Sequence, residues 1–407
     1  MRMLISYAAL FLSVVLLQLG TGGVAPLDAL SGVALGFSAA EIGLLGSAHF
    51  FGFFLGCWWA PRLMGAVGHS RAFAAFTAAG TIGIMAHMMV PDPLAWAALR
   101  MLPGFCVAGC YTVIEAWMQA KVTNETRGRA MGVYRAVDIG GNLGAQLIIG
   151  ILPPAAYFSY TLLAILCCAA LLPITVTKTE EPETGLAPRL RPGLALRLSP
   201  LGAAGVIVAG VTGAAFRMVG PVYGIEVGLG ADAIALFLAA FVVGGAAAQY
   251  PVGWLADKYD RRKVLIALSV AAVLACGLTV LVSTAGTVPV FAAVIVFGFT
   301  TMPVYSVSTA HAHDFATAAE RVELSAALMF LFALGAIASP VLSSALIAAY
   351  GPEALFVMIS VAHVVLIVFG LWRMRARPAP EDRTAYIYTP RTSFTLGKLT
   401  ARLRDRR

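Results

Sequence analysis

Between two long apolar runs, the chain carries the polar stretch GWLADKYDRRK, residues 253–263. The flanking runs cover about 231–256 and 264–284, and each is long enough to cross a bilayer as a helix, which needs about 20 apolar residues. Lysine and arginine in a short loop beside a span favour the cytoplasmic side. The stretch therefore predicts a helical hairpin in a membrane, with its tight loop in the cytoplasm.

The composition of the whole chain agrees with this reading. Of 407 residues, 60% are hydrophobic and 12% charged, whereas about a quarter are charged in soluble domains. So few polar groups cannot cover the surface of a soluble protein of this size. The net charge of +8 would suggest a nucleic-acid partner only if the basic residues shared one soluble face. They are spread over many loops, so no nucleic acid is expected.

Working outward from the hairpin, apolar runs predict an all-α integral membrane fold of twelve spanning helices. The N-terminal run resembles a signal peptide but has no clear cleavage site, and we interpret it as an uncleaved first helix. The predicted spans are 4–26, 39–61, 71–90, 94–118, 130–151, 155–177, 200–222, 231–256, 264–284, 288–312, 322–349 and 353–373.

Charge placement gives an independent test of this topology, because basic residues gather in cytoplasmic loops. With both termini inside, Lys and Arg fall in the inner segments, and the outer loops carry only acids such as Asp92, Glu226 and Glu353. Three arginines, Arg100, Arg135 and Arg217, lie within predicted spans. This pattern predicts a multi-pass protein with both termini in the cytoplasm.

The chain also divides into two similar halves. We predict an N-terminal six-helix half over 1–177, a cytoplasmic linker over 178–199, a C-terminal six-helix half over 200–374 and a basic cytoplasmic tail over 375–407. A shift of 194 residues superposes several identical residues, which indicates a duplication of the kind found in parallel-repeat transporters. The matched pairs are Gly104 with Gly298, Tyr111 with Tyr305, Arg127 with Arg321, and Gly141 with Gly335.

The loop after span 8 resembles the signature of the major facilitator superfamily, Gly-x-x-x-Asp-x-x-Gly-Arg-Arg. Gly253, Asp257, Arg261 and Arg262 match it, and Asp260 stands where the family has glycine. The resemblance implies a cytoplasmic gating loop in which Asp257 caps the next turn or pairs with the arginines. The alternative interpretation is an ordinary positively charged loop.

The first half carries a degraded copy of the same loop. Gly56 is followed by Ala60 where aspartate is expected and then by Arg62, and Gly68 to Arg71 follow after an insertion. The gating function is therefore expected in the second half. The loop Arg127–Arg129 and Glu115-Ala-Trp117 are similar to a little-characterised bacterial sugar- and drug-type branch of the family.

Span 4 contains Arg100-Met-Leu-Pro-Gly104, which looks like the family's Arg-x-x-x-Gly motif. In the family this arginine is associated with proton coupling. An arginine inside a span is costly and usually faces a cavity or a partner, although Arg100 could also extend to the outer interface. Asp28, near the outer end of span 1, could face Arg100 or lie in an outer loop in water.

A second group of charges lies near the inner ends of spans 4 and 5. Arg135 and Asp138 are three residues apart and share a helix face, and Glu115 is expected at the same depth. Two acids beside one base would favour a proton on one carboxyl, so all three are proton-coupling candidates. A static interhelical ion pair is an equal alternative.

Other polar residues within spans are candidates to line a substrate cavity, namely Arg217, Asn142, Gln146, Gln249 and Tyr305. Arg217 could bind an anionic group, Asp138 or Gln249. His311, His313 and Asp314 could bind a metal or titrate, but we interpret the histidines as a hydrated interfacial pair. Five tryptophans near inner helix ends fit an interfacial belt, namely Trp58, Trp59, Trp117, Trp254 and Trp372.

These patterns together predict a secondary active transporter that moves a small organic solute by alternating access, coupled to protons, with efflux as one direction. An uncoupled facilitator, a lipid flippase and a non-transporting membrane sensor are the alternatives. We expect a monomer in a bacterial inner membrane, with a small-molecule substrate, protons and membrane lipid as partners. No cofactor, metal site or catalytic site is expected, and no nucleotide-binding loop is found.

Overall fold

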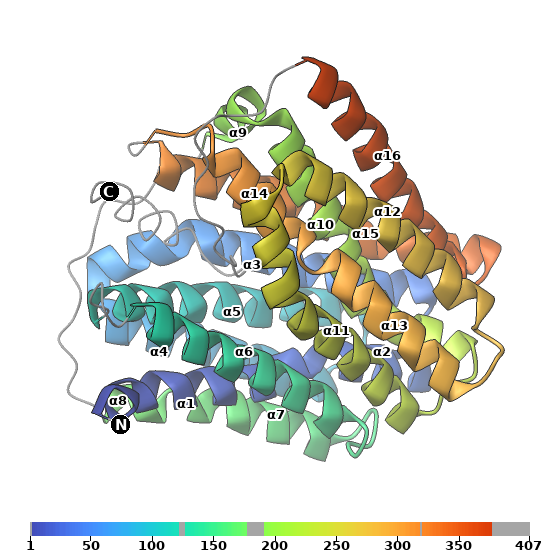
Figure 1. The fold of residues 1–407 in the computed structure, drawn as a ribbon. Coiled ribbons are helices and arrows are strands. Elements are labelled where there is room, and N and C mark those ends of the chain that lie inside the picture. The colour runs from blue at the N-terminus through green and yellow to red at the C-terminus, as the bar shows by residue number, and fades with distance from the viewer. Residues whose placement is uncertain (1, 122–126, 177–190, 318–319, 377–407) are drawn as a thin grey trace. The chain divides into compact units, whose positions relative to one another are not determined.

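The apolar runs fold into helices, as Figure 1 shows. The structure is a computed structural model that describes residues 2–121, 127–176, 191–317 and 320–376. Within these ranges no strand occurs, and eleven segments are long and apolar enough to cross a membrane. The chain separates into two compact units, residues 1–187 and 188–407, and each is described by itself.

The first unit contains the predicted spans 1 to 6. Span 1 consists of two helices, α1 and α2, interrupted at Gly23, and it continues to Ala34 rather than ending at 26. The helix extends further because Asp28, which suggested a loop, has a buried partner. The helices are α1 (Arg2–Gly22), α2 (Val24–Ala34), α3 (Ala39–Val67), α4 (His69–Ala86), η1 (His87–Met89), α5 (Pro93–Lys121), α6 (Arg127–Ile149), α7 (Tyr157–Ala169) and α8 (Leu172–Thr175).

The second unit contains the predicted spans 7 to 12. Span 10 is broken between α13 and α14, where Pro303 lacks the N–H that would continue the helical hydrogen bonds. The helices are α9 (Pro192–Leu198), α10 (Pro200–Glu226), α11 (Ala231–Lys258), α12 (Arg261–Leu281), α13 (Thr287–Thr301), α14 (Val304–His313), α15 (Arg321–Tyr350) and α16 (Ala354–Ala376).

One predicted span is not among the eleven apolar segments. It corresponds to α6, a helix of 23 residues whose Arg135, Asp138, Asn142 and Gln146 lower its hydropathy. All twelve predicted spans therefore coincide with helices. Of the predicted linker, the part over 192–198 forms the short helix α9, whereas residues 177–190 and the tail from 377 lie outside the described residues.

Glycines set the closest helix contacts in both units. In the first unit, a methyl group at Gly52 would overlap the carbonyl of Met101, and one at Gly104 would overlap the carbonyl of His49. These contacts join α3 and α5 backbone to backbone, which only small residues permit.

The second unit repeats this crossing between α11 and α13. A methyl group at Gly244 would overlap the carbonyl of Ile295, and one at Gly298 would overlap that of Phe241. Gly104 and Gly298, matched by the shift of 194 residues, thus occupy the same crossing of two corresponding helices. Both units therefore contain a close backbone contact at this pair of matched glycines.

Candidate functional site

The first unit encloses a buried ion pair that joins α2 to α5. Arg100 Nε lies 3.0 Å from Asp28 Oδ2, and the two side chains are 1% and 3% exposed. Asp28 is therefore not an outer-loop residue, and Arg100 does not extend to the interface. The structure brings together two of the predicted proton-coupling candidates.

Two further side chains complete this cluster. Tyr160 on α7 donates a hydrogen bond of 2.9 Å to Asp28 Oδ1, and His87 Nε2, at the end of α4, lies 3.7 Å from Asp28 Oδ2. The His87 ring stacks on Tyr160 at 5.5 Å and meets Trp96 edge-on at 5.0 Å. We call Asp28, Arg100, His87 and Tyr160 the first-half cluster.

The sequence analysis missed His87 and Tyr160. A signal for His87 was available, because it lies four residues before Pro91 and Arg100 lies seven residues after Pro93, so both are near the same loop. Tyr160 gave no such signal, since a tyrosine near the start of an apolar span is also typical of the membrane interface.

The chemistry of the first-half cluster follows from its burial. A carboxylate is tolerated away from water when it is paired and hydrogen-bonded, and here Arg100 supplies the charge and Tyr160 a donor. A proton added to Asp28 cancels that charge and removes the carboxylate that Arg100 Nε faces at 3.0 Å. One proton therefore changes the free energy of the local arrangement by a large amount.

A second polar cluster surrounds Asp138 on α6. Asp138 Oδ1 accepts hydrogen bonds from Gln18 Nε2 at 2.7 Å and from Tyr111 Oη at 2.6 Å, and Arg135 Nη1 lies 3.9 Å from Asp138 Oδ2. Arg135 and Asp138 therefore share a helix face, and their role in proton coupling stays a prediction. Glu115 is buried on α5, one helical turn from Tyr111, and its membership of this cluster stays a prediction.

The predicted cavity-lining residues are distributed over both units. Gln146 Nε2 donates to the carbonyl of Gly22 at 3.3 Å, and Gln249 Nε2 donates to the carbonyl of Gly245 at 2.8 Å. Tyr305 is buried with its ring edge-on to Phe332. Asn142 on α6 and Arg217 on α10 are half-buried. A role in substrate binding remains a prediction for all five.

The predicted gating loop in the second unit is built around Arg261, which is 1% exposed. Arg261 Nη2 lies 3.3 Å from Asp257 Oδ1, as the signature implied, but its shorter contact is from Nη1 to Asp314 Oδ1 at 2.6 Å. Arg261 also donates to the carbonyls of Ala256 and Ala310. We call Arg261, Asp257 and Asp314 the second-half lock. Gly253 is buried one turn earlier on α11.

The departure from the signature at Asp260 has a structural reason. Asp260 is the N-cap of α12, where its side chain accepts from the backbone N–H of Arg262, and it forms an ion pair of 2.7 Å with Arg262 Nη2. Burial opposes ionisation of this carboxyl, but the hydrogen bonds and charge of Arg262 outweigh it and hold the pKa of Asp260 below its usual value.

The corresponding loop of the first unit holds no acid at Ala60, and Arg62 turns back onto the ring of Trp58. Gly68, with φ of +84°, links α3 to α4. His69, the first residue of α4, packs its ring against Trp117 at 5.9 Å. Trp117 is 1% exposed, so its assignment to the interfacial belt was wrong, whereas Trp58 and Trp59 are exposed as a belt requires.

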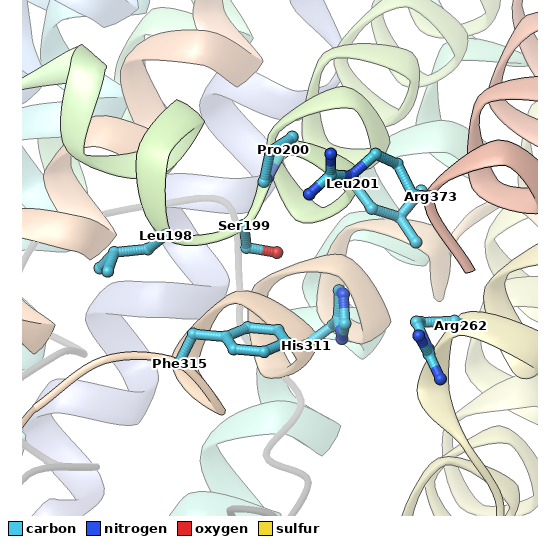
Figure 2. A pocket seen from close by; sticks show the side chains of 8 residues that line it. All are labelled: Leu198, Ser199, Pro200, Leu201, Arg262, His311, Phe315 and Arg373. Atoms are coloured by element: carbon cyan, nitrogen blue, oxygen red, sulfur yellow. The ribbon is translucent and has the colours of Figure 1, made fainter. Parts of the chain in front are cut away.

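The histidines near the end of α14 are buried, with His311 4% and His313 9% exposed, so they are not the exposed interfacial pair that the sequence suggested. His313 Nε2 lies 3.2 Å from Ser325 Oγ. His311 lines a small pocket with Arg262, Arg373 and Ser199, where a volume of about 20 Å³ has room for one water. Figure 2 shows the lining of this pocket, with His311 on α14, Arg262 on α12, Arg373 on α16 and Ser199 just before α10.

Comparisons with known proteins agree with this architecture. A sequence profile of the Major Facilitator Superfamily matches residues 10–240 and 201–402. An uncharacterised MFS-type transporter of Enterobacter sp. (strain 638) is 26% identical over 345 residues, covering 84% of this chain and 88% of the relative. An uncharacterised MFS-type transporter of Salmonella arizonae is 25% identical over the same length.

Solved structures share the fold at low sequence identity. The nucleoside transporter NupG superposes with a TM-score of 0.73 at 15% identity, covering 91% of this chain and 98% of that one. The D-xylose–proton symporter superposes with a TM-score of 0.71 at 12% identity, covering 92% and 98%. With its two six-helix units and a family profile that matches most of its length, the chain belongs to the Major Facilitator Superfamily of membrane transporters.

Proposed function

We propose that the chain is a proton-coupled secondary transporter of a small organic solute, working by alternating access, with Asp28 and Arg100 as its coupling pair. The observation that carries the proposal is the ion pair of 3.0 Å between side chains that are 3% and 1% exposed. Ionisable residues at such depth in a membrane protein are costly and commonly mark proton relays.

The proposed coupling is a competition for Asp28. With Asp28 ionised, the carboxylate ties α2 to α5 through Arg100. With Asp28 protonated, the ion pair with Arg100 is lost, and an arrangement of the first unit that places Arg100 in other surroundings becomes favoured. A membrane potential favours inward proton movement by about 2.3 kcal/mol per charge per 100 mV, which can drive solute export or import.

Orientation and setting complete the proposal. The distribution of Lys and Arg supports cytoplasmic termini, and the bacterial relatives support an inner membrane. We propose that the second-half lock then lies at the cytoplasmic end of its unit and opens when the transporter faces inward. The working unit is proposed to be a monomer.

The test is transport into liposomes that contain the purified full chain, with internal pH recorded alongside solute flux. The solutes to be screened are sugars including D-xylose, nucleosides, organic acids and cationic drugs. We expect proton movement that depends on one of these solutes and disappears in Asp28→Asn. Asp232→Asn is the matched control, because Asp232 is exposed at the start of α11, and it should transport normally.

Each other outcome of this experiment identifies a different mechanism. Loss of proton movement in Glu115→Gln or Asp138→Asn, but not in Asp28→Asn, would transfer the coupling role to the second polar cluster. Solute flux without proton movement would contradict coupling and indicate a facilitator. If no solute moves, lipid translocation is measured next, and its absence too would leave a sensor and refute transport.

A further inference from the structure

The first-half cluster contains a polar atom that its hydrogen bonds leave unused. His87 is fully buried, and its Nδ1 lies 2.5 Å from the carbonyl oxygen of Gly83. Because a carbonyl only accepts hydrogen bonds, Nδ1 must carry the hydrogen of the neutral ring. The other nitrogen, Nε2, is then the one that gains or loses a proton, and it makes no hydrogen bond with the described residues.

The unused nitrogen faces the coupling carboxylate. His87 Nε2 lies 3.7 Å from Asp28 Oδ2, the same oxygen that pairs with Arg100 Nε. An imidazole lone pair and a carboxylate oxygen repel each other when both are buried without a proton between them. A proton on either atom turns this repulsion into attraction, and a small approach of the two side chains would make a hydrogen bond.

The other neighbours of His87 cannot take that proton. Arg100 is a cation without an acceptor atom, and Tyr160 Oη already donates its hydrogen to Asp28 Oδ1. Trp96 on α5 donates its ring N–H to the backbone carbonyl of His87 at 2.7 Å, which fixes the position of η1. Of the described groups around the ring, Asp28 and His87 are thus the pair that can exchange a proton.

We propose that His87 is the second proton-accepting residue of the first-half cluster, sharing one proton with Asp28. In the transfer, the O–H bond at Asp28 Oδ2 breaks and an N–H bond forms at His87 Nε2, which gives a carboxylate and an imidazolium. This inference rests on the proposed coupling role of Asp28. It assigns to His87 a function beyond that of the ion pair.

The two positions of the proton have different consequences for the unit. A proton on His87 leaves Asp28 charged, so the contact with Arg100 holds, and the imidazolium is attracted by Asp28 and repelled by Arg100. A proton on Asp28 cancels the contact with Arg100. His87 therefore delays the opening of the ion pair until the proton moves on to Asp28, and it fixes the pH range in which opening occurs.

The test measures the ring nitrogens of His87 directly and needs no solute. The full chain is labelled with ¹⁵N-histidine and studied by NMR in lipid nanodiscs over a range of pH, with His87→Gln identifying the His87 signals among the six histidines. We expect the neutral ring to carry its hydrogen on Nδ1. In Asp28→Asn, the ratio of imidazolium to neutral ring at a given pH should fall about tenfold or more.

The control is His363, which is buried in the second unit with Nε2 3.2 Å from Thr212 Oγ1 and should not respond to Asp28→Asn. A hydrogen on Nε2 in the neutral wild-type ring would overturn the proposal without any variant. An unchanged ratio in Asp28→Asn would overturn it as well. Because no transport is measured, either result is distinct from a failure of the proposed function.

If Asp28→Asn does not fold, the carboxyl provides a second measurement. The infrared band of protonated carboxyl groups is recorded against pH in wild type and in His87→Gln. Because His87 and Asp28 are proposed to share one proton, the pH dependence of this band should differ between the two proteins. An identical titration of this band in the two proteins would overturn the proposal.

Discussion

The two units carry their buried ion pairs at opposite ends of corresponding helices. In the first unit, Arg100 stands near the start of α5, whereas in the second unit Asp314 directly follows the end of α14. The shift of 194 residues places Val222 and Val294 opposite Asp28 and Arg100, and both valines are buried. The two halves thus share the glycine contacts between corresponding helices, but their buried ion pairs lie at different positions.

The second unit fills the region that corresponds to the first-half cluster with aromatic rings. Tyr223 meets Phe356 edge-on at 4.9 Å, and Phe356 in turn contacts Phe297 at 5.5 Å. Ring packing of this kind contains no ion pair that a proton could neutralise. The two units therefore differ in what fills this region, which is an ion pair in the first unit and aromatic rings in the second.

The largest effect is expected from breaking the second-half lock. Arg261→Ala removes the buried cation that Asp314 contacts at 2.6 Å and should lower the free energy of unfolding by about 3–5 kcal/mol, measured by denaturant titration in lipid bicelles. Replacing both partners, as in Arg261→Met with Asp314→Leu, should recover most of this loss. Arg262→Ala is the matched control, and a loss equal to that of Arg261→Ala would show that burial of the pair is not the cause.

A smaller effect is expected from giving the first unit the acid that its loop lacks. Ala60 is buried, and the first residue of α4 is His69 rather than an arginine, so Ala60→Asp should destabilise the chain by about 1–3 kcal/mol through an unsatisfied polar group. Adding His69→Arg should restore part of this loss. If Ala60→Asp alone were neutral, the two loops would be interchangeable and the contrast between the halves would fail.

The smallest effect is expected at the cap of α12. Asp260→Asn should cost about 1 kcal/mol at neutral pH, because the charge that pairs with Arg262 is lost. Since its pKa is lowered in the folded state, the contribution of Asp260 is present above the unfolded pKa. It should disappear as the pH falls through the folded pKa.

The measurement for this cap is the difference in unfolding free energy between wild type and Asp260→Asn from pH 7 to pH 3. The difference should shrink on acidification. A difference that stays constant over this range would show that the charge of Asp260 contributes nothing. In the first unit the N-cap of α4 is Gly68, which makes no side-chain cap hydrogen bond. We therefore expect no pH-dependent contribution from this position.

The spans and their pairing into halves could be predicted because lipid imposes one rule on every helix. A run of apolar residues long enough to cross the bilayer is visible without knowledge of contacts. The first span was predicted too short because Asp28 looked like a loop residue. Whether a charge inside an apolar run has a partner depends on the rotation of its helix, which such uniformly apolar sequences do not reveal.

The candidate site was predicted in part for the same reason. Arg100 and Asp28 were selected since charges are rare in spans, and the structure joins them. His87 and Tyr160 were missed because the search selected residues that carry a full charge at neutral pH, and histidine and tyrosine do not. Asp314 was noticed, but its partner Arg261 is more than fifty residues earlier in the chain. The sequence does not indicate which residues so far apart come into contact.

The glycine crossings of α3 with α5 and of α11 with α13 have a mechanical consequence. Contacts between side chains can adjust to a displacement by a change of rotamer. A contact between a glycine and a backbone carbonyl contains no side chain that could adjust. At each crossing we therefore expect the two helices to move together as one rigid body. Gly104 lies one helical turn from Arg100, so a force that arises at the ion pair is transmitted along α3 and α5 together rather than lost in local rearrangement.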